Sequence, residues 1–216
     1  MRASRVLATV SLCLFGAVSV SGQNGPTRQP SVQAEVETEY TLPDGTQRRS
    51  KGRFYRNQFG QVREDSGLGA VITDLRAGTV TLLIAETKEA HVIRIPASER
   101  TPAEANRPAH ELFEETTIAG RRTRKARTTG PNGQRVEFWT AEDLGIVTLT
   151  KSESGGMTAV RELKNISTLE PEPELFMIPA DYRLIELKRP SPGAGPKIPP
   201  PPGAGPERGR GPGGIQ

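Results

Sequence analysis

Residues 32–46 read VQAEVETEYTLPDGT, and this stretch decides the fold. Val32, Ala34 and Val36 alternate with glutamine and glutamate, which is the period of a β-strand with one buried and one solvated face. The string PDGT is typical of a tight turn, because proline presets φ and glycine supplies a positive φ. The stretch therefore predicts a strand over 32–42 that turns into a polar partner strand over 47–55.

Similar short segments recur along the chain at intervals typical of an antiparallel meander. Further strands are predicted over 61–64, 69–74, 79–85, 90–95, 112–117, 121–128, 135–140, 145–152, 158–169 and 181–187. Residues 96–111 are predicted as a long loop or a loop with one helical turn, and 170–176 as a single helical turn that directs Leu175 and Phe176 inward. The predicted fold class is mainly β: a strongly curved, half-barrel-like antiparallel sheet of about ten strands with little helix, with a sandwich or a barrel as the alternatives.

The two ends of the chain differ in composition from the middle. Arg2 and Arg5 precede an apolar run over 6–20 and small residues at 20–22, which predicts a signal peptide over residues 1–22. The apolar run is shorter than the roughly 20 residues that span a bilayer, so no transmembrane segment is expected after cleavage. An uncleaved anchor and a lipid attached at Cys13 are the alternatives. We expect a periplasmic or secreted protein.

The remaining boundaries follow from where the alternation begins and ends. Residues 23–31 are predicted as a flexible N-terminal segment and 32–188 as a single β domain. In the 28 residues from 189 to 216, 17 are proline or glycine, so this tail cannot bury enough apolar surface to order itself. It is predicted to be a disordered, basic, Pro/Gly-rich tail.

The net charge of +4 resides in the two ends. Residues 23–188 contain 23 basic and 24 acidic side chains, so the predicted domain is electrically balanced. The overall basicity is therefore no argument for a nucleic-acid partner, and none is expected. The single cysteine, Cys13, lies in the predicted signal peptide, which leaves no thiol chemistry in the mature chain.

The sequence contains no strong catalytic or metal-binding pattern. It has neither a nucleophile elbow nor a phosphate-binding glycine loop. His110 and Glu111 open a zinc-protease pattern, but residue 114 is glutamate where the second histidine would stand. Glu170, Glu172 and Glu174 are interpreted as the start of a short helix rather than a calcium site. We expect no enzymatic activity, no cofactor and no metal.

The densest basic run, RRTRKAR, occupies residues 121–127. Two interpretations apply: a solvated strand whose charges pair with the Glu35, Glu37 and Glu39 strand or with Glu114 and Glu115, or a contact with an anionic surface such as lipid headgroups or wall polymer. The candidate ligand or anionic-surface contacts are Arg121, Arg122, Arg124, Lys125, Arg127 and Trp139.

Several strings occur together in a distinctive order. They are DG at 44–45, YR at 55–56, FGQVRE at 59–64, TDLRAG at 73–78, IAG at 118–120 with Thr123, VEFW at 136–139, DLGI at 143–146, LKNI at 163–166, EPEPELF at 170–176 and IPADY at 178–182. Over residues 32–186 the chain resembles an uncharacterised family of exported β-sheet proteins from bacteria of Acidobacteria type. More loosely, its layout is similar to the periplasmic lipoprotein-carrier (LolA-like) and sigma-regulator sheet fold, although this chain lacks clear covering helices.

This resemblance implies no activity and no catalytic residues, but it implies a sheet that cups a lipid or peptide. The first hypothesis is an exported, non-enzymatic binding or carrier-like protein that holds a lipid, lipopeptide or peptide on its concave face. The alternative is an envelope structural or interaction protein tethered through its Pro/Gly-rich tail. The expected partners are a lipid, a lipoprotein or a cell-envelope polymer.

Overall fold

The computed structural model describes residues 28–97, 111–130 and 133–187. The predicted signal peptide at 1–22, most of the loop at 96–111, the centre of the hairpin loop at 131–132 and the tail at 189–216 lie outside the described residues, and so does most of the segment at 23–31.

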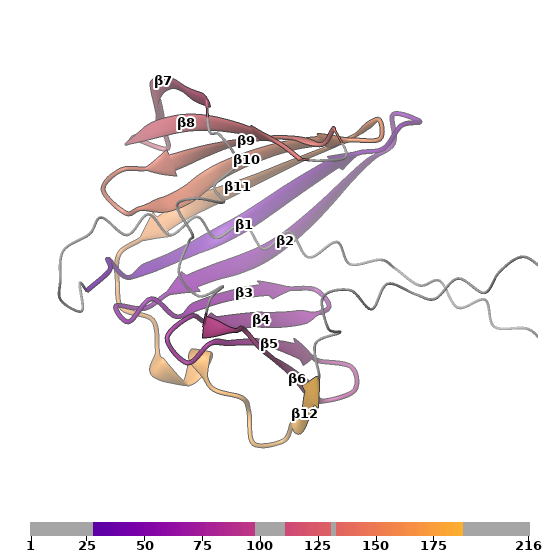
Figure 1. The fold of residues 1–216 in the computed structure, drawn as a ribbon, viewed down its shortest axis with the longest axis vertical. Helices are drawn as coiled ribbons and strands as arrows, with labels where there is room; N and C mark the ends of the chain where they lie inside the picture. Colours follow the sequence, from indigo (N-terminus) through magenta and orange to yellow (C-terminus); the bar gives the residue numbers. More distant parts are fainter. Residues whose placement is uncertain (1–27, 98–110, 131–132, 188–216) are drawn as a thin grey trace, which may run out of the picture.

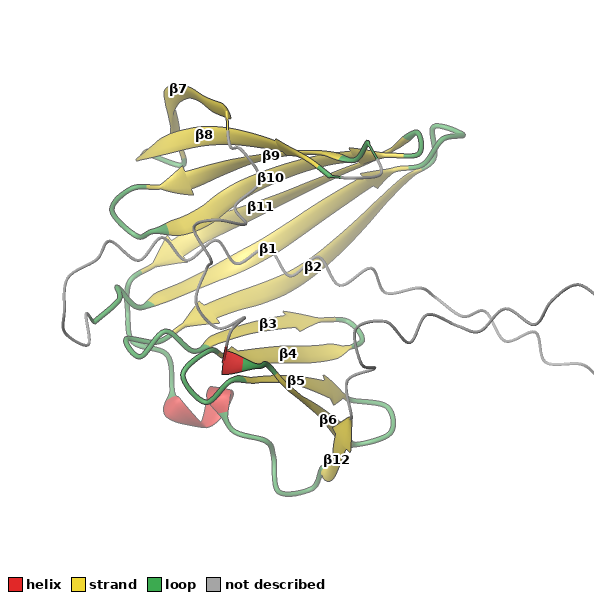
Figure 2. Ribbon diagram, in the orientation of Figure 1, coloured by secondary structure: helices red, strands yellow, loops and turns green. Residues whose placement is uncertain are grey.

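The described chain forms one curved, unclosed sheet of twelve strands, which confirms the predicted fold class (Figures 1 and 2). The strands are β1 (Val32–Thr41), β2 (Gln47–Arg56), β3 (Val62–Ser66), β4 (Gly69–Asp74), β5 (Thr79–Ile84), β6 (Glu89–Arg94), β7 (Glu111–Ile118), β8 (Arg121–Thr129), β9 (Arg135–Ala141), β10 (Ile146–Ser154), β11 (Met157–Ser167) and β12 (Arg183–Leu187). The 3-10 turn η2 (Pro173–Phe176) confirms the helical turn predicted over 170–176, and its Phe176 is buried.

The order of strands across the sheet is β12-β6-β5-β4-β3-β2-β1-β11-β10-β9-β8-β7. All neighbours are antiparallel except β12, which runs parallel to β6. The predicted antiparallel connections are therefore wrong for this last strand. The connection from β11 to β12 is long and includes η2, and a parallel neighbour requires such a crossover instead of a hairpin.

Bulges interrupt three of the strand pairs in the sheet. The register shifts between β1 and β11 beside Gln33, between β10 and β9 beside Val147, and between β7 and β8 beside Phe113. Asn165 has φ 52° at the β11 bulge, a conformation that asparagine tolerates better than most residues. Because a bulge bends its strand and increases the local twist, these shifts help to curl the sheet into an open half-barrel.

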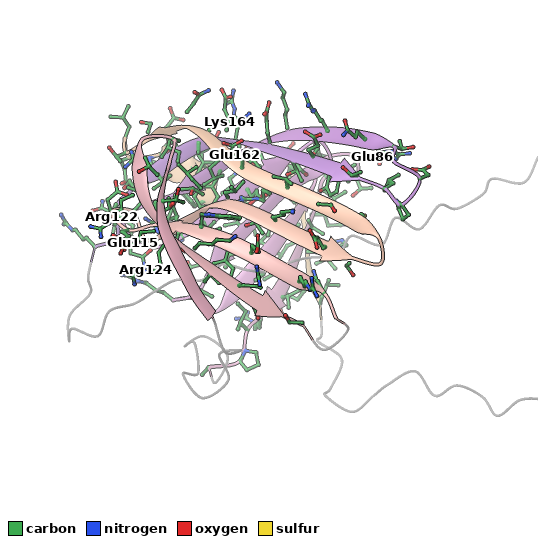
Figure 3. The ribbon with its side chains drawn as sticks, turned by 90° about the horizontal axis from the view of Figure 1, so that it is seen from above. Glu86, Glu115, Arg122, Arg124, Glu162 and Lys164 are labelled. Atoms are coloured by element: carbon green, nitrogen blue, oxygen red, sulfur yellow. The ribbon has the colours of Figure 1, made fainter. Side chains whose placement is uncertain are left out.

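The two faces of the sheet differ along its length. We call the face that carries Glu37, Glu162 and Lys164 the convex face, since Figure 3 shows the latter two on the outer side of the curved sheet. The opposite, concave face carries Val32, Ala34 and Val36 of β1, together with Leu163 of β11, which is paired with Val36. These four side chains are buried in one cluster with Ala141, Leu144 and Ile146 around the β9–β10 turn.

A second apolar cluster lies on the other face. The paired registers place Ala70, Leu83 and Ala90 on the same face as Arg53 and Glu35, which is the convex one. With Ile72 they form a buried cluster against which Ile178 and Tyr182 pack. The segment that follows β11 therefore covers the convex face of β4–β6, and the same segment contains η2.

Strands β2 and β3 approach each other closely at Gly52. A Cβ atom at this position would lie 2.1 Å from the backbone oxygen of Asp65. We expect Gly52→Ala to lower the free energy of unfolding by about 3 kcal/mol, because the strands must move apart. Urea denaturation measures this change. Gly67→Ala is the control, since its Cβ would have no neighbour within 4 Å, and equal losses in the two variants would contradict the close approach.

Candidate ligand-binding face

An apolar strip runs across the concave face of the strands from β4 to β12. Two rows of paired residues define it, one through Val71, Leu82 and Ile185, with His91 of β6 between the last two, and one through Val80, Ile93 and Leu187. His91 is the polar member of the first row and contacts Glu89. We call these six residues the concave strip. Val80 is buried, but Leu82 is 39% exposed and Leu187 is 41% exposed. The strip is therefore apolar surface that the described part of the chain only partly covers.

The local sequence explains why apolar side chains occupy both faces here. Apolar residues stand at consecutive positions in these strands, at 70–72 in β4 and at 82–84 in β5, unlike in β1. A strand of this composition is typical of a sheet layer with apolar surroundings on both sides. Ile178 and Tyr182 supply those surroundings on the convex side.

A bidentate ion pair crosses the concave face beside this strip. Arg161 of β11 donates to the carboxylate of Glu64 of β3 through Nη2 at 2.6 Å and through Nε at 3.3 Å. The guanidinium carbon lies 6.0 Å from the centre of the Phe54 ring. Strands β11 and β3 are three spacings apart, about 14 Å on a flat sheet. The pair therefore reaches over β1 and β2, where Gly52 presents no side chain on this face.

Small and hydroxyl side chains surround Arg161. The paired residues in its row are Thr38 and Ser50 on one side and Thr150 on the other. The next row carries Ala159 and Ser152. The concave face thus changes from apolar at the concave strip to polar around Arg161.

A second arginine closes one end of the concave face. Arg56 is 3% exposed and donates to the carbonyl oxygens of Pro30, Leu144 and Gly145, with the Nη2–Pro30 oxygen distance at 2.8 Å. Burial lowers the pKa of Arg56 to about 10. Main-chain carbonyls satisfy this guanidinium in place of a carboxylate, and they fix the β9–β10 turn to the start of β1.

The predicted basic contacts lie on β8 and β9, and each basic side chain is paired with a carboxylate. Glu137 contacts Lys125 and Arg127, Glu142 contacts Arg122 and Arg124, Asp143 contacts Arg121, and Glu115 contacts Arg122. Lys125 Nζ also lies 4.8 Å from the centre of the Trp139 ring. The structure thus brings the six candidates onto neighbouring strands with their charges compensated, while their contact with an anionic surface stays a prediction.

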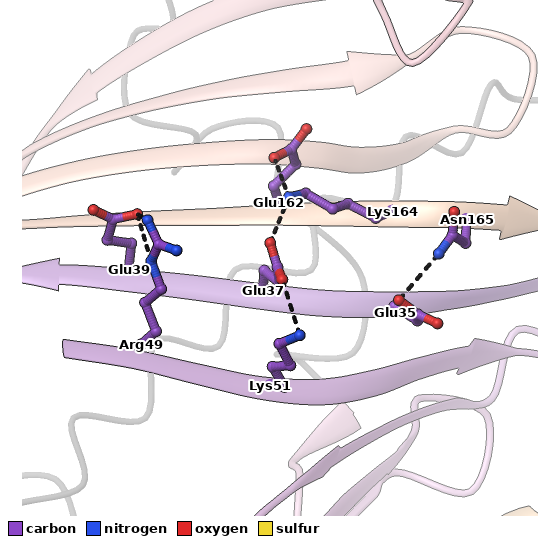
Figure 4. Close-up of polar contacts among 8 residues, drawn as sticks. All are labelled: Glu35, Glu37, Glu39, Arg49, Lys51, Glu162, Lys164 and Asn165. Carbon is purple, nitrogen blue, oxygen red and sulfur yellow. Dashed lines mark hydrogen bonds and ion pairs between the residues drawn. The ribbon is translucent and has the colours of Figure 1, made fainter.

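The interpretation that paired this run with the Glu35, Glu37 and Glu39 strand is wrong. Strand β1 lies between β2 and β11, so its acids find partners there, as Figure 4 shows. The partners are Lys51 and Lys164 for Glu37, Arg49 for Glu39 and Asn165 for Glu35. The Lys164 ammonium and, to a smaller extent, Lys51 hold the pKa of Glu37 below its usual value. The other expected partner, Glu115, does pair with the basic run through Arg122.

No local pattern pointed to Arg161 and Glu64, because they are isolated charges 97 residues apart that only the sheet brings together. The concave strip did leave a signal in the consecutive apolar residues at 70–72 and 82–84. Within the described ranges, no three His, Cys, Asp or Glu side chains are grouped as a metal site would require. The same residues include no helix that is long and apolar enough to cross a membrane.

Comparisons with known proteins concern the fold. Neither a protein-family model nor a curated protein matches this sequence. An uncharacterised conserved protein from Thermus thermophilus has a similar structure, with a TM-score of 0.53 and 12% identity over 74% of this chain and 91% of that one. The fold of this chain is therefore similar to that of this uncharacterised protein.

The matches also include the two kinds of sheet to which the layout was expected to be loosely similar. The MucA/MucB complex of Pseudomonas aeruginosa matches with a TM-score of 0.48 and 16% identity, over 75% of this chain and 60% of that one. A LolA superfamily protein from Nitrosomonas europaea matches with a TM-score of 0.38 and 11% identity, over 69% and 90% of the two chains. At these scores the likeness is one of general sheet layout.

Glu137 allows a pH test of the charge pairing on β8 and β9. Arg127, and then Lys125, hold the pKa of this carboxyl below its usual 4.5. A lowered folded-state pKa stabilises the fold fully above about 4.5, and this stabilisation is lost as the pH falls through the lower value. We expect the difference in unfolding free energy between the wild type and Glu137→Gln to be constant from neutral pH to about 5 and to shrink below 4.5. Denaturant unfolding across this pH range measures the difference in unfolding free energy. Glu86→Gln on the exposed β5–β6 turn is the control. A difference that grows on acidification contradicts the pairing.

Proposed function

We propose that this chain is an exported, non-enzymatic binding protein of carrier type that holds a lipid, lipopeptide or peptide on its concave face. The observation that carries the proposal is the concave strip, which is apolar, partly exposed and directed into the hollow of an unclosed sheet. A binding site for an apolar ligand needs a concave, mainly apolar surface with a few polar groups that fix orientation. The concave strip supplies the apolar surface, and the Arg161–Glu64 pair supplies the polar groups.

The distribution of charge supports the choice of face. The convex side of β1, β2 and β11 carries a ladder of ion pairs around Glu37, Lys51 and Lys164, whose surface water solvates well. The convex side of β4–β6 is already covered by Ile178 and Tyr182. A ligand in the hollow would bury the part of the concave strip that is exposed, which includes Leu82 and Leu187.

Loss of the apolar strip should weaken binding. We expect the double variant Val71→Thr, Leu82→Thr to bind the uncharged probe N-phenyl-1-naphthylamine about tenfold more weakly, because each exchange removes apolar contact area while keeping a β-forming residue. Probe fluorescence measures the affinity. The matched control is Leu68→Thr, Leu184→Thr, which changes two exposed leucines outside the concave face. Equal affinity in the test and control variants, or no binding by the wild type, would defeat the proposal.

The alternative, an envelope interaction protein tethered through residues 189–216, rests on the composition of that tail. Four basic side chains against one acidic side chain, with a proline run at 199–202, would suit an anionic polymer or a proline-binding partner. We expect deletion of 189–216 to release the protein from the envelope fraction in this case. Cell fractionation measures how much protein stays with the envelope. The control is a shorter tail deletion that keeps the four basic side chains. Unchanged retention without residues 189–216 counts against the tether.

A further inference from the structure

We propose that Arg161 binds the anionic headgroup of the ligand, so that the ligand is a single-chain amphiphile with a carboxylate or phosphate group, and that Glu64 occupies this position when the ligand is absent. The inference rests on the proposed function and deepens it. It names the chemistry of the ligand's polar end and the direction in which the ligand lies.

The register of the sheet aligns the apolar strip with the ion pair. Glu64 of β3, Val71 of β4, Leu82 of β5, His91 of β6 and Ile185 of β12 are successive partners in one row across the concave face. From the first to the last strand this row is four spacings long, about 19 Å. A single extended acyl chain laid along it would place its end at Glu64 and therefore at Arg161.

Arg161 has the environment of an anion-binding residue. Its side chain is only 25% exposed, and the Phe54 ring lies beside the guanidinium. Thr38 and Thr150 are its paired neighbours on this face. A planar guanidinium with two donors directed the same way matches carboxylate and phosphate oxygens, and hydroxyl neighbours can donate to the remaining oxygens.

Glu64 has the properties of a replaceable partner. A partly buried guanidinium without a counter-charge is costly, so the empty protein needs a carboxylate at this point. Glu64 supplies it across three strand spacings and is itself 42% exposed, more than Arg161. An amphiphile that brings its own anion offers Arg161 the same bonds and adds the burial of its chain on the concave strip, so Glu64 can turn into solvent when the ligand binds.

The test compares two ligands that share a chain and differ in charge. Palmitate and methyl palmitate are titrated against full-length protein loaded with N-phenyl-1-naphthylamine, and displacement of the probe gives both affinities. In the wild type we expect palmitate to bind about tenfold more tightly than its methyl ester. Arg161→Gln should abolish this preference by weakening palmitate binding about tenfold more than ester binding, and Glu64→Gln should increase the preference, because the internal competitor is gone.

Two further variants separate the headgroup contact from changes in folding or in general charge. Arg161→Lys keeps a cation and should retain part of the preference if Arg161→Gln proves poorly folded. Lys164→Gln removes a cation from the convex face of the same strand and should leave the preference intact. Equal affinities for the two ligands in the wild type, or a preference that survives Arg161→Gln, overturn the headgroup site while the proposed function stands. Failure of both ligands and of the probe to bind overturns both.

Discussion

The apolar residues on both faces of β4–β6 are the constraint on which the rest of the structure depends. A sheet that exposed Ala70, Ile72, Leu83 and Ala90 to water on the convex side would forfeit their hydrophobic stabilisation. The chain therefore returns behind the sheet after β11, packs Ile178 and Tyr182 against this cluster, and ends as the parallel edge strand β12. Ion pairs from β6 and its turn, Glu89–Arg183, Lys88–Asp181 and Arg94–Glu186, hold the edge strand in place.

Covering one face of these strands leaves the other face as the surface on which the proposed function rests. The strands around β1 and β11 bury their apolar side chains on the concave side, where Val32, Val36 and Leu163 pack with Leu144 and Ile146. Strands β4–β6 bury apolar side chains on their convex side and carry most of the concave strip on the other side. Because the buried face changes from concave at β1 and β11 to convex at β4–β6, apolar surface lies in the hollow next to a polar region centred on Arg161.

The ion pairs of this molecule lie in two settings. On the convex face and on β8 and β9, cations and carboxylates alternate on neighbouring strands, and most of these exposed pairs contribute little stability each. On the concave face the Arg161–Glu64 pair lies beside the Phe54 ring and next to the concave strip. Its place in the hollow, next to apolar surface, is the basis of the proposed headgroup site.

The sequence by itself determined the strands. Alternation over 32–42, turn residues such as Pro43, Asp44 and Gly45, and β-branched segments located all twelve strands within a few residues of their ends, because these signals act between neighbours in the chain. It also indicated the single helical turn with Phe176 inward. Only the tertiary structure decided which strands are neighbours. The pairing expected between residues 121–127 and the Glu35–Glu39 strand was therefore wrong, the pairing with Glu115 was right, and the parallel β12 was unforeseen. The tertiary structure alone brought Arg161 to Glu64, since a contact between residues 97 positions apart depends on strand order and curvature, which no local pattern encodes.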